Sequence, residues 1–392
     1  MLKRLPPATI VVGAGFAGSI LAERFATQLH RHVILLERRK HIAGNMYDRH
    51  DAAGILVHQY GPHIFRTDHE HVWSYLSQFT DWRDYHHKVR ASVDGQLVPV
   101  PFNLTSLELL YPQDRAAALT ARLLARYGQG AKTPVSELRR CEDPEIAALG
   151  EFIFQKIYLN YTVKQWGEPP ESLDFETITR RVPVRISHED GYFQQKHQAM
   201  PREGYTRMFE RMLAHPNIEI RLGVDATRVL ELLPEGRILF EGRPFDGPVI
   251  YSGSADELFR YRHGELPYRS LDFKFRTLQQ DVFQPVAVVN YPNDRPYTRI
   301  TEFKHLTGQQ LPGVTTIAEE YSLAYDRSAA VGSEPYYPIP KASTDAQHAQ
   351  YKAEAARYPN LYLVGRLAEY RYYDMNDIIV RALAAFDELK GS

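Results

Sequence analysis

The spacing of apolar residues over the first 60 positions changes from a short run to a helical repeat and back. Residues 9–12 (TIVV) form a β-rich apolar run, followed by the glycine-rich stretch 13–18 (GAGFAG) and a helical pattern that contains residues 22–26. A second apolar run, residues 33–37 (VILLE), comes next. This order predicts a Rossmann-type βαβ unit, in which backbone N–H groups and a helix N-terminus face a pyrophosphate.

The rest of the chain divides into three kinds of segment. From Asp68 to about Leu173 apolar residues recur every three to four positions, which predicts helices. Short alternating runs with Pro-Asn-Asp and Leu-Pro-Gly turns predict strands, and a helical pattern from Asp377 closes the chain. We therefore predict an α/β fold made of a discontinuous Rossmann-type domain (residues 1–67, 206–262 and 345–392), an inserted helical bundle (68–173) and an antiparallel β-sheet domain (174–205 and 263–344).

Composition removes several classes of function. The 47 lysines and arginines balance 48 acidic residues, so the net charge of −1 points to neither nucleic acid nor an anionic membrane as a partner. Cys141 is the only cysteine, which excludes an internal disulfide and fits a reducing compartment. No apolar run approaches the roughly 18 residues of a membrane span, and Met1–Pro7 lacks a signal-peptide core. We therefore expect a cytoplasmic protein, and the absence of an H-E-x-x-H spacing predicts no metal site.

Glu37 ends the second apolar run, about 20 residues after the glycines, where an acidic side chain accepts a hydrogen bond from a ribose hydroxyl. An acidic residue here argues against a 2′-phosphate, so the predicted ligands are NAD or FAD. The alternative is a purely structural βα turn.

Two aromatic segments are candidates for ring binding. Residues 60–66 (YGPHIFR) place His63 after a Gly-Pro bend, which can bring backbone carbonyls close to a planar cofactor, although a structural histidine is the alternative. Tyr158, Tyr161, Lys164 and Trp166 lie at the end of a predicted helix. These aromatic side chains either sandwich a base or belong to the core.

Arginines recur beside predicted strand ends in three distant segments, at Arg181, Arg299 and Arg366. A guanidinium matches phosphate oxygens, so converging arginines would form a diphosphate clamp, whereas solvated surface arginines are the alternative. Residues 369–377 directly precede the closing helix. Their polar side chains can cap this helix, whose positive end could face the electron-rich N1–C2=O edge of a flavin.

Taken together, eight motifs in this order closely resemble those of bacterial UDP-galactopyranose mutases, and the resemblance covers nearly the whole chain. They are G-A-G-F-A-G, A-G-N-M-Y-D, Y-G-P-H-I-F, N-Y-T-V-K-Q-W-G, R-V-P-V-R, P-Y-T-R-I-T-E-F-K-H, E-P-Y-Y-P and G-R-L-A-E-Y-R-Y-Y-D-M. The resemblance implies an FAD-binding Rossmann domain, a helical bundle with a mobile lid, an antiparallel sheet over the cleft, and a homodimer.

The family interconverts UDP-galactopyranose and UDP-galactofuranose without net redox change. It works only with reduced FAD, whose N5 attacks the anomeric carbon and displaces UDP. The resemblance therefore implies a nucleotide-sugar substrate and a cellular flavin reductant as partners.

Matched motif by motif, the resemblance also implies roles for individual residues. Arg181 and Arg299 form the diphosphate clamp, and His63 and the Pro62 carbonyl lie next to flavin N5. The other substrate-binding residues are Tyr161 at the uridine, Trp166 in the lid, Tyr192, Tyr336 and Tyr372 at the phosphates, and Asn290 at the sugar. The cofactor-binding residues are Gly13, Gly15, Phe16, Ala17, Gly18, Glu37, Arg38, Gly44, Asn45, Arg366, Asp374 and Met375.

Three positions depart from the family pattern. Ala43 replaces the first glycine of G-G-N, and Asn376 replaces a common acidic residue. Arg66 stands near the sugar, where most galactose enzymes have histidine. We predict that Arg66 reaches a carbonyl on a C2 N-acetyl group, so that UDP-N-acetylgalactosamine is also accepted. The alternative is an Arg66 that faces the surface without contacting substrate.

Two other functions share the dinucleotide fingerprint. A flavin-dependent oxidoreductase of the amine-oxidase type would show net redox turnover. A non-catalytic binding protein, like the dissociation inhibitors of small GTPases, would be favoured if the purified protein were not yellow.

Overall fold

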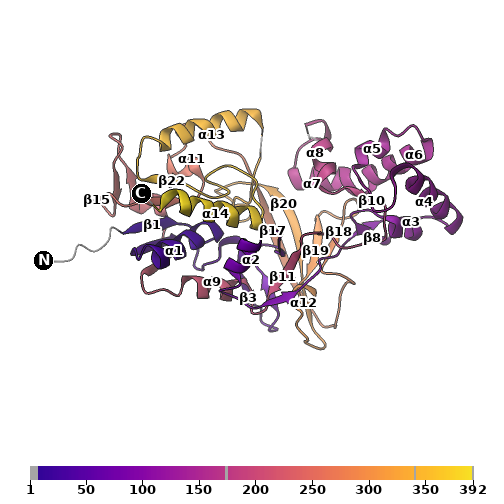
Figure 1. The fold of residues 1–392 in the computed structure, drawn as a ribbon, viewed down its shortest axis with the longest axis horizontal. Helices are drawn as coiled ribbons and strands as arrows, with labels where there is room; N and C mark the ends of the chain where they lie inside the picture. Colours follow the sequence, from indigo (N-terminus) through magenta and orange to yellow (C-terminus); the bar gives the residue numbers. More distant parts are fainter. Residues whose placement is uncertain (1–7, 173–174, 340, 391–392) are drawn as a thin grey trace.

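The computed structural model describes residues 8–172, 175–339 and 341–390. The predicted domain boundary at residues 173–174 lies outside the described residues, as does the N-terminal segment expected to lack a signal-peptide core. A parallel sheet with its covering helices occupies one end of the molecule, a second sheet lies next to it, and a group of helices occupies the other end (Figure 1).

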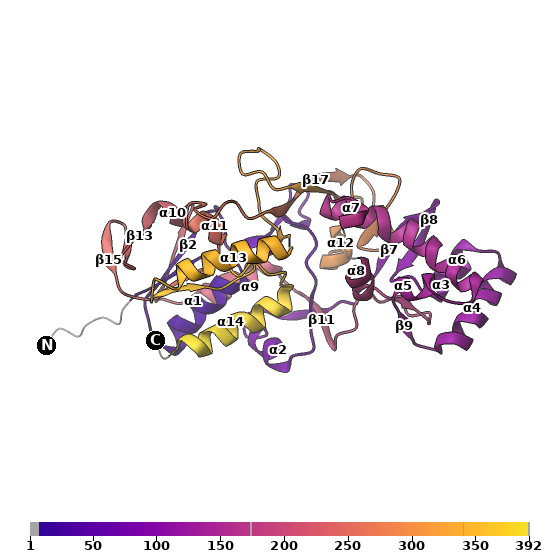
Figure 2. The same cartoon turned by 90° about the horizontal axis from the view of Figure 1, so that it is seen from above.

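The parallel sheet collects strands from three separated parts of the chain, in the order β12-β2-β1-β16-β22. These strands are β1 (Thr9–Val12), β2 (Val33–Glu37), β12 (Ile218–Leu222), β16 (Val249–Tyr251) and β22 (Leu361–Leu363). Because side chains alternate along a strand, Val11 joins one core and Ile10 joins another. The first core contains residues of α1 (Phe16–Gln28), α9 (Tyr205–Leu213) and α14 (Met375–Leu389), and the second contains residues of α11 (Ala255–Leu258) and α13 (Ala342–Ala355). Figure 2 shows α1 and α14 beside each other over this part of the chain.

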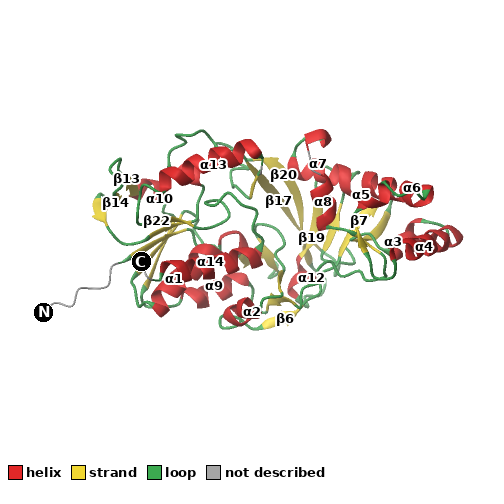
Figure 3. Cartoon of the chain, turned by 45° about the horizontal axis from the view of Figure 1, so that its top comes forward, coloured by secondary structure: helices red, strands yellow, loops and turns green. Residues whose placement is uncertain are grey.

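A seven-stranded mixed sheet lies between the parallel sheet and the helical region (Figure 3). Its order is β21-β17-β20-β19-β18-β7-β8, and only the β18–β7 pairing is parallel. The strands are β7 (Val89–Val93), β8 (Gln96–Val100), β17 (Tyr268–Leu278), β18 (Val288–Asn290), β19 (Arg299–Glu302), β20 (Thr315–Ala324) and β21 (Tyr337–Pro338).

The helical region contains short helices with clear start signals. Asn103 forms a capping box with Ser106 at the start of α3, and Asp143 caps α6 directly before Pro144. Gly150 lets α6 approach α5, because a Cβ there would lie 2.6 Å from the Arg139 nitrogen. The helices are α3 (Leu104–Leu110), α4 (Gln113–Tyr127), α5 (Val135–Arg139), α6 (Pro144–Ile153), the π-helix Phe154–Leu159, α7 (Asn160–Trp166) and α8 (Phe175–Arg181).

The structure differs from the expected helical segment at residues 89–100, which form the β7–β8 hairpin of the seven-stranded sheet. The alternation of buried Val89, Ala91 and Val93 and the Asp94-Gly95 turn explain this hairpin. Smaller elements complete the fold: β3 (Asp48–His50) with β4 (Leu56–His58); β5 (Phe65–Thr67), β11 (His197–Pro201) and β6 (Trp82–Asp84); β9 (Lys132–Thr133) with β10 (Val184–Arg185); β13 (Leu230–Leu232), β14 (Ile238–Phe240) and β15 (Arg243–Phe245); α2 (Glu70–Leu76), α10 (Ala226–Val229) and α12 (Phe303–Thr307); and the 3₁₀ turns Gly44–Met46 and Pro170–Ser172.

Candidate active site

One cavity of about 1010 Å³ is lined by residues of the parallel sheet, the seven-stranded sheet and helices α7 and α8. Every predicted site residue lines this cavity except Gly18 and Tyr336. Segments that are distant in the sequence, and that carry different motifs, therefore meet around this cavity.

One part of the cavity is lined by glycines, whose lack of side chains lets a dinucleotide approach the backbone closely. Gly13 adopts φ +95°, and a Cβ on Gly44 would lie 2.9 Å from the Gly15 Cα. The Glu37 carboxylate, at the end of β2, accepts hydrogen bonds from the backbone nitrogens of Ala14 and Arg39, both at 2.8 Å. A glycine cradle beside a fixed carboxylate fits the pyrophosphate and ribose of FAD.

Gly18 packs against this cradle but does not line the cavity. A Cβ at Gly18 would lie 1.8 Å from the Gly13 carbonyl oxygen, so this glycine lets α1 pack against the turn after β1. Its side of the helix faces the sheet and not the cavity, as expected for the third glycine of the fingerprint.

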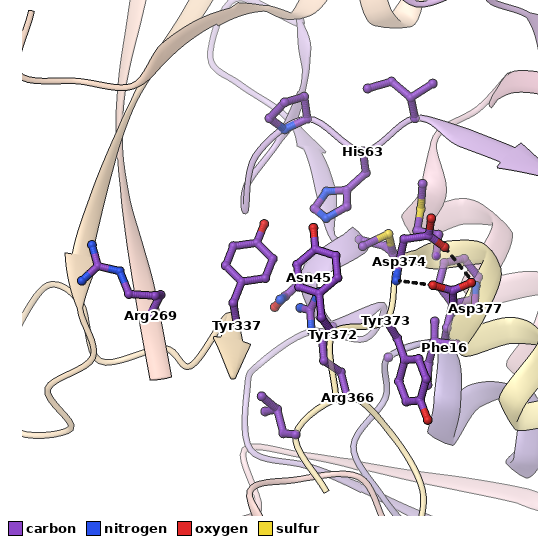
Figure 4. A pocket seen from close by; sticks show the side chains of 18 of the residues that line it. Phe16, Asn45, His63, Arg269, Tyr337, Arg366, Tyr372, Tyr373, Asp374 and Asp377 are labelled. Carbon is purple, nitrogen blue, oxygen red and sulfur yellow. Dashed lines mark hydrogen bonds between the residues drawn. The ribbon is translucent and has the colours of Figure 1, made fainter. Parts of the chain in front are cut away.

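The N-terminus of α14 reaches the same cavity. Asp374 accepts a hydrogen bond from the Asp377 nitrogen at 3.0 Å, and Asp377 accepts one from the Asp374 nitrogen at 3.3 Å. Figure 4 shows this reciprocal cap on the side of the pocket where Phe16 lies. The cap leaves the second Asp374 oxygen free to accept from Arg66 Nη2 at 2.8 Å.

Arg66 faces the cavity and not the surface. Its guanidinium carbon lies 4.0 Å from the centre of the Phe193 ring, and its side chain is 23% exposed. The aromatic ring and the Asp374 carboxylate together fix the plane of the guanidinium, because one packs against its face and the other accepts at its edge.

His63 is held as a neutral ring with one defined tautomer. Burial, together with the nearby His58 and Arg366, lowers the pKa of His63 to about 3. The Gly61 carbonyl lies 2.8 Å from His63 Nδ1 and can only accept, so Nδ1 carries the proton. His63 therefore presents an unprotonated Nε2, and Figure 4 shows the ring directed into the pocket.

Arg299 begins β19 and is paired with Glu320 on the neighbouring strand. The two residues are directly opposite in the register, and Arg299 Nε donates to Glu320 at 2.7 Å. Burial alone would lower the pKa of Arg299, but the negative charge of Glu320 outweighs it and raises this pKa. Arg299 therefore remains a cation whose Nε donates to Glu320, while its two Nη groups form no hydrogen bond with the described residues.

Arg181 approaches the cavity from α8. It is exposed, and its guanidinium carbon lies 5.5 Å from the centre of the Tyr372 ring. Arg366 packs similarly against Tyr337, at 5.2 Å, and the rings of Tyr337 and Tyr372 stack at 5.5 Å. Arg181, Tyr372, Tyr337 and Arg366 thus form one continuous wall of arginines and tyrosines.

Tyr337, and not the predicted Tyr336, contributes to this wall. Tyr336 is 4% exposed and packs against Tyr60 and Phe273. Consecutive side chains in an extended segment point to opposite faces, so only one of the pair can line the cavity. The E-P-Y-Y-P motif located the segment, but the structure places Tyr337 in the cavity lining instead of the predicted Tyr336.

Helix α7 carries Tyr161 and Trp166 into the cavity and is fastened at its C-terminus. Arg269 Nε donates to the Gln165 carbonyl at 3.0 Å, and Ser322 Oγ donates to the same carbonyl at 2.6 Å. These bonds satisfy carbonyl groups that the end of a helix leaves unpaired.

Two polar side chains beside the seven-stranded sheet, those of Asn290 and His87, line the cavity. The buried Asn290 Oδ1 has no hydrogen-bond partner among the described residues, which leaves an acceptor for a ligand hydroxyl. The sequence prediction missed His87, which also lines the cavity. Burial, together with the positive charges of Arg299 and Arg66, lowers its pKa to about 3, so His87 is neutral.

We expect Glu320→Gln to lower kcat about tenfold without raising KM, which corresponds to a rise of ~1.4 kcal/mol in the activation free energy. Glutamine keeps an acceptor for Arg299 Nε but removes the charge that holds the guanidinium in place. Steady-state kinetics of the reduced protein would test this positioning role. Glu319→Gln is the matched control, because Glu319 pairs with Arg276 and does not line the cavity. Equal losses in both variants would contradict the role.

Within the described residues, no helix is long and apolar enough to cross a membrane, and no group of His, Cys, Asp or Glu is arranged to hold a metal ion.

Comparisons with known proteins identify similar nucleotide-sugar mutases. Residues 156–372 match the family model described as UDP-galactopyranose mutase, and residues 11–79 match an NAD(P)-binding Rossmann-like domain. The chain is 37% identical to a probable UDP-galactopyranose mutase of Klebsiella pneumoniae, covering 98% of this chain and 94% of the relative. It is 33% identical to a dTDP-fucopyranose mutase of Escherichia coli, covering 95% and 96%. A crystal structure of reduced UDP-galactopyranose mutase superposes with a TM-score of 0.73 at 18% identity, covering 99% of this chain and 94% of that one, which shows the shared fold.

Proposed function

Because the chain belongs to the UDP-galactopyranose mutase family, we propose that it interconverts UDP-galactopyranose and UDP-galactofuranose. The predictions of this family, of an isomerase, of the α/β fold class and of FAD as cofactor are confirmed. The observation that carries the finer proposal is the single cavity, which joins the glycine cradle to the wall of arginines and tyrosines.

When bound and reduced, FAD would supply a nucleophilic N5 lone pair for displacement of UDP from the anomeric carbon. Arg299 and Arg181 would hold the diphosphate, because both guanidinium groups line the cavity. Both would thereby keep the leaving UDP close enough to return. Tyr192, Tyr337 and Tyr372 would add hydroxyl donors, and Tyr161 and Trp166 would cover the nucleotide.

Neutral histidines suit this chemistry. His63 and His87 carry no charge near neutral pH, because both have pKa values of about 3. Neither ring would compete with the arginines for the diphosphate. The Asn290 acceptor would bind a sugar hydroxyl and orient the ring, which supports its predicted role as a sugar contact.

We further propose that Arg66 reads the substituent on C2 of the sugar. Its Nη2 is committed to Asp374, but a guanidinium has five N–H donors, so others remain for an N-acetyl carbonyl. The position of Arg66 at the cavity wall, held against Phe193, supports this assignment. The substrates would then include UDP-N-acetylgalactosamine as well as UDP-galactose.

Arg66→His is expected to lower kcat/KM for UDP-N-acetylgalactosamine by tenfold or more, about 1.4 kcal/mol, with a smaller loss for UDP-galactose. Histidine has fewer donors and a shorter reach, so the N-acetyl carbonyl would lose its partner. Kinetics with both sugars on the dithionite-reduced protein would measure the ratio. Equal losses for the two sugars, or no turnover of the N-acetyl sugar by the parent protein, would show that Arg66 does not read C2.

A panel of nucleotide sugars tests the proposed substrate. The reduced protein is incubated with UDP-galactose, UDP-N-acetylgalactosamine and dTDP-fucose, and furanose products are separated by chromatography. We expect a furanose product from UDP-galactose. Formation of product from dTDP-fucose alone would reassign the substrate within the same family. The homodimer, the cytoplasmic location, the absence of a nucleic-acid partner and the cellular flavin reductant stay predictions.

A further inference from the structure

The ion pair between Arg66 and Asp374 links two residues that we assigned from the sequence to different parts of the site. The residues are 308 positions apart, and Arg66 Nη2 lies 2.8 Å from Asp374 Oδ2. Arg66 was expected at the sugar and Asp374 beside the flavin. A charge at one of these places is therefore coupled to a charge at the other.

The pair is partly shielded from water. The side chains are 23% and 29% exposed, and both line the cavity. Phe193 covers one face of the Arg66 guanidinium. Charges in such a setting are screened less by solvent and salt than charges on an open surface.

Other ionisable groups line the same cavity as the pair. Asp377 shares the α14 cap with Asp374, and Arg366 lines the same cavity. His63 and His87 are neutral because burial lowers the pKa of each to about 3. Removing either member of the pair therefore changes the net charge at this part of the wall by one unit.

We propose that Arg66 and Asp374 tune the reduction potential of the bound flavin in opposite directions. This inference rests on the proposed function, in which FAD works in its reduced state. Two-electron reduction of FAD with uptake of one proton adds one negative charge to the ring system. The Arg66 cation favours the reduced form, and the Asp374 anion opposes it. The residue that faces the sugar thus also adjusts how readily the flavin is reduced.

The test is the two-electron potential of the FAD-loaded protein, measured by equilibration with reference dyes and no sugar present. We expect Arg66→Gln to make reduction at least tenfold less favourable, a drop of about 30 mV. Asp374→Asn should raise the potential by a similar amount, and the double variant should lie between the two.

Arg90→Gln provides the matched control. Arg90 is 21% exposed and pairs with Asp190 at 3.3 Å, but it does not line the cavity, so its loss should leave the potential unchanged. Shifts of the same sign in Arg66→Gln and Asp374→Asn would indicate a structural effect of the α14 cap and overturn the proposal, as would no shift. Protein that binds no FAD would instead refute the proposed function.

Discussion

Replacement of Arg299 or Arg181 by alanine is expected to lower kcat/KM by about 30-fold to more than 1,000-fold, ~2–5 kcal/mol, while FAD remains bound. Each residue would lose a charge-assisted contact with the diphosphate, and neither touches the glycine cradle. The Arg299 effect should be the larger, because Arg299→Ala also leaves the Glu320 carboxylate, 6% exposed, without its partner.

Two further variants separate these contributions. Arg299→Ala combined with Glu320→Gln removes the stranded charge, so the loss that remains reports the diphosphate contact. Arg180→Ala is the control for Arg181, because Arg180 pairs with Glu176 and does not line the cavity. Turnover is measured with the flavin content determined from absorbance. Near-wild-type turnover in either alanine variant would remove that arginine from the clamp.

Loading the protein with 5-deaza-FAD is expected to abolish turnover, by about 1,000-fold or more, because this analogue lacks the N5 lone pair. The only thiol, Cys141, lies just after α5 and does not line the cavity, so it cannot replace the missing nucleophile. The oxidised protein should also be inactive, because N5 of oxidised FAD is an electrophilic imine nitrogen and not a nucleophilic amine. Dithionite should restore activity only with authentic FAD.

Equal binding of FAD and 5-deaza-FAD, measured by quenching of protein fluorescence, is the necessary control. Full activity with the analogue or with oxidised FAD would contradict the proposed role of N5 and would direct attention to a protein nucleophile.

Local patterns in the sequence were sufficient to predict the glycine-rich turn after β1 and the acidic residue at the end of β2. The glycine at position 18 was predictable because its need arises within one βαβ unit, where α1 meets the turn after β1. The acidic residue at the end of β2 was predictable for the same reason. These features depend on neighbours in sequence, which a motif records.

Features that depend on pairing between distant segments were not predictable. Glu320 meets Arg299 only because β19 and β20 pair in one register. Tyr337 replaces Tyr336 through a shift of one residue, which reverses the face that a side chain occupies. The Arg66–Asp374 pair depends on how α14 approaches β5, and no spacing in the sequence contains that information.

The number of turnovers that follow one reduction of the flavin distinguishes a mutase from an oxidoreductase. The FAD in the protein is reduced once with a stoichiometric amount of dithionite under argon, and UDP-galactofuranose is added in about 100-fold excess. We expect conversion of the excess to UDP-galactopyranose, with the flavin absorbance still that of the reduced form and no consumption of NAD(P)H. One product molecule per flavin, formed as the flavin becomes oxidised, would refute a mutase and identify an oxidoreductase.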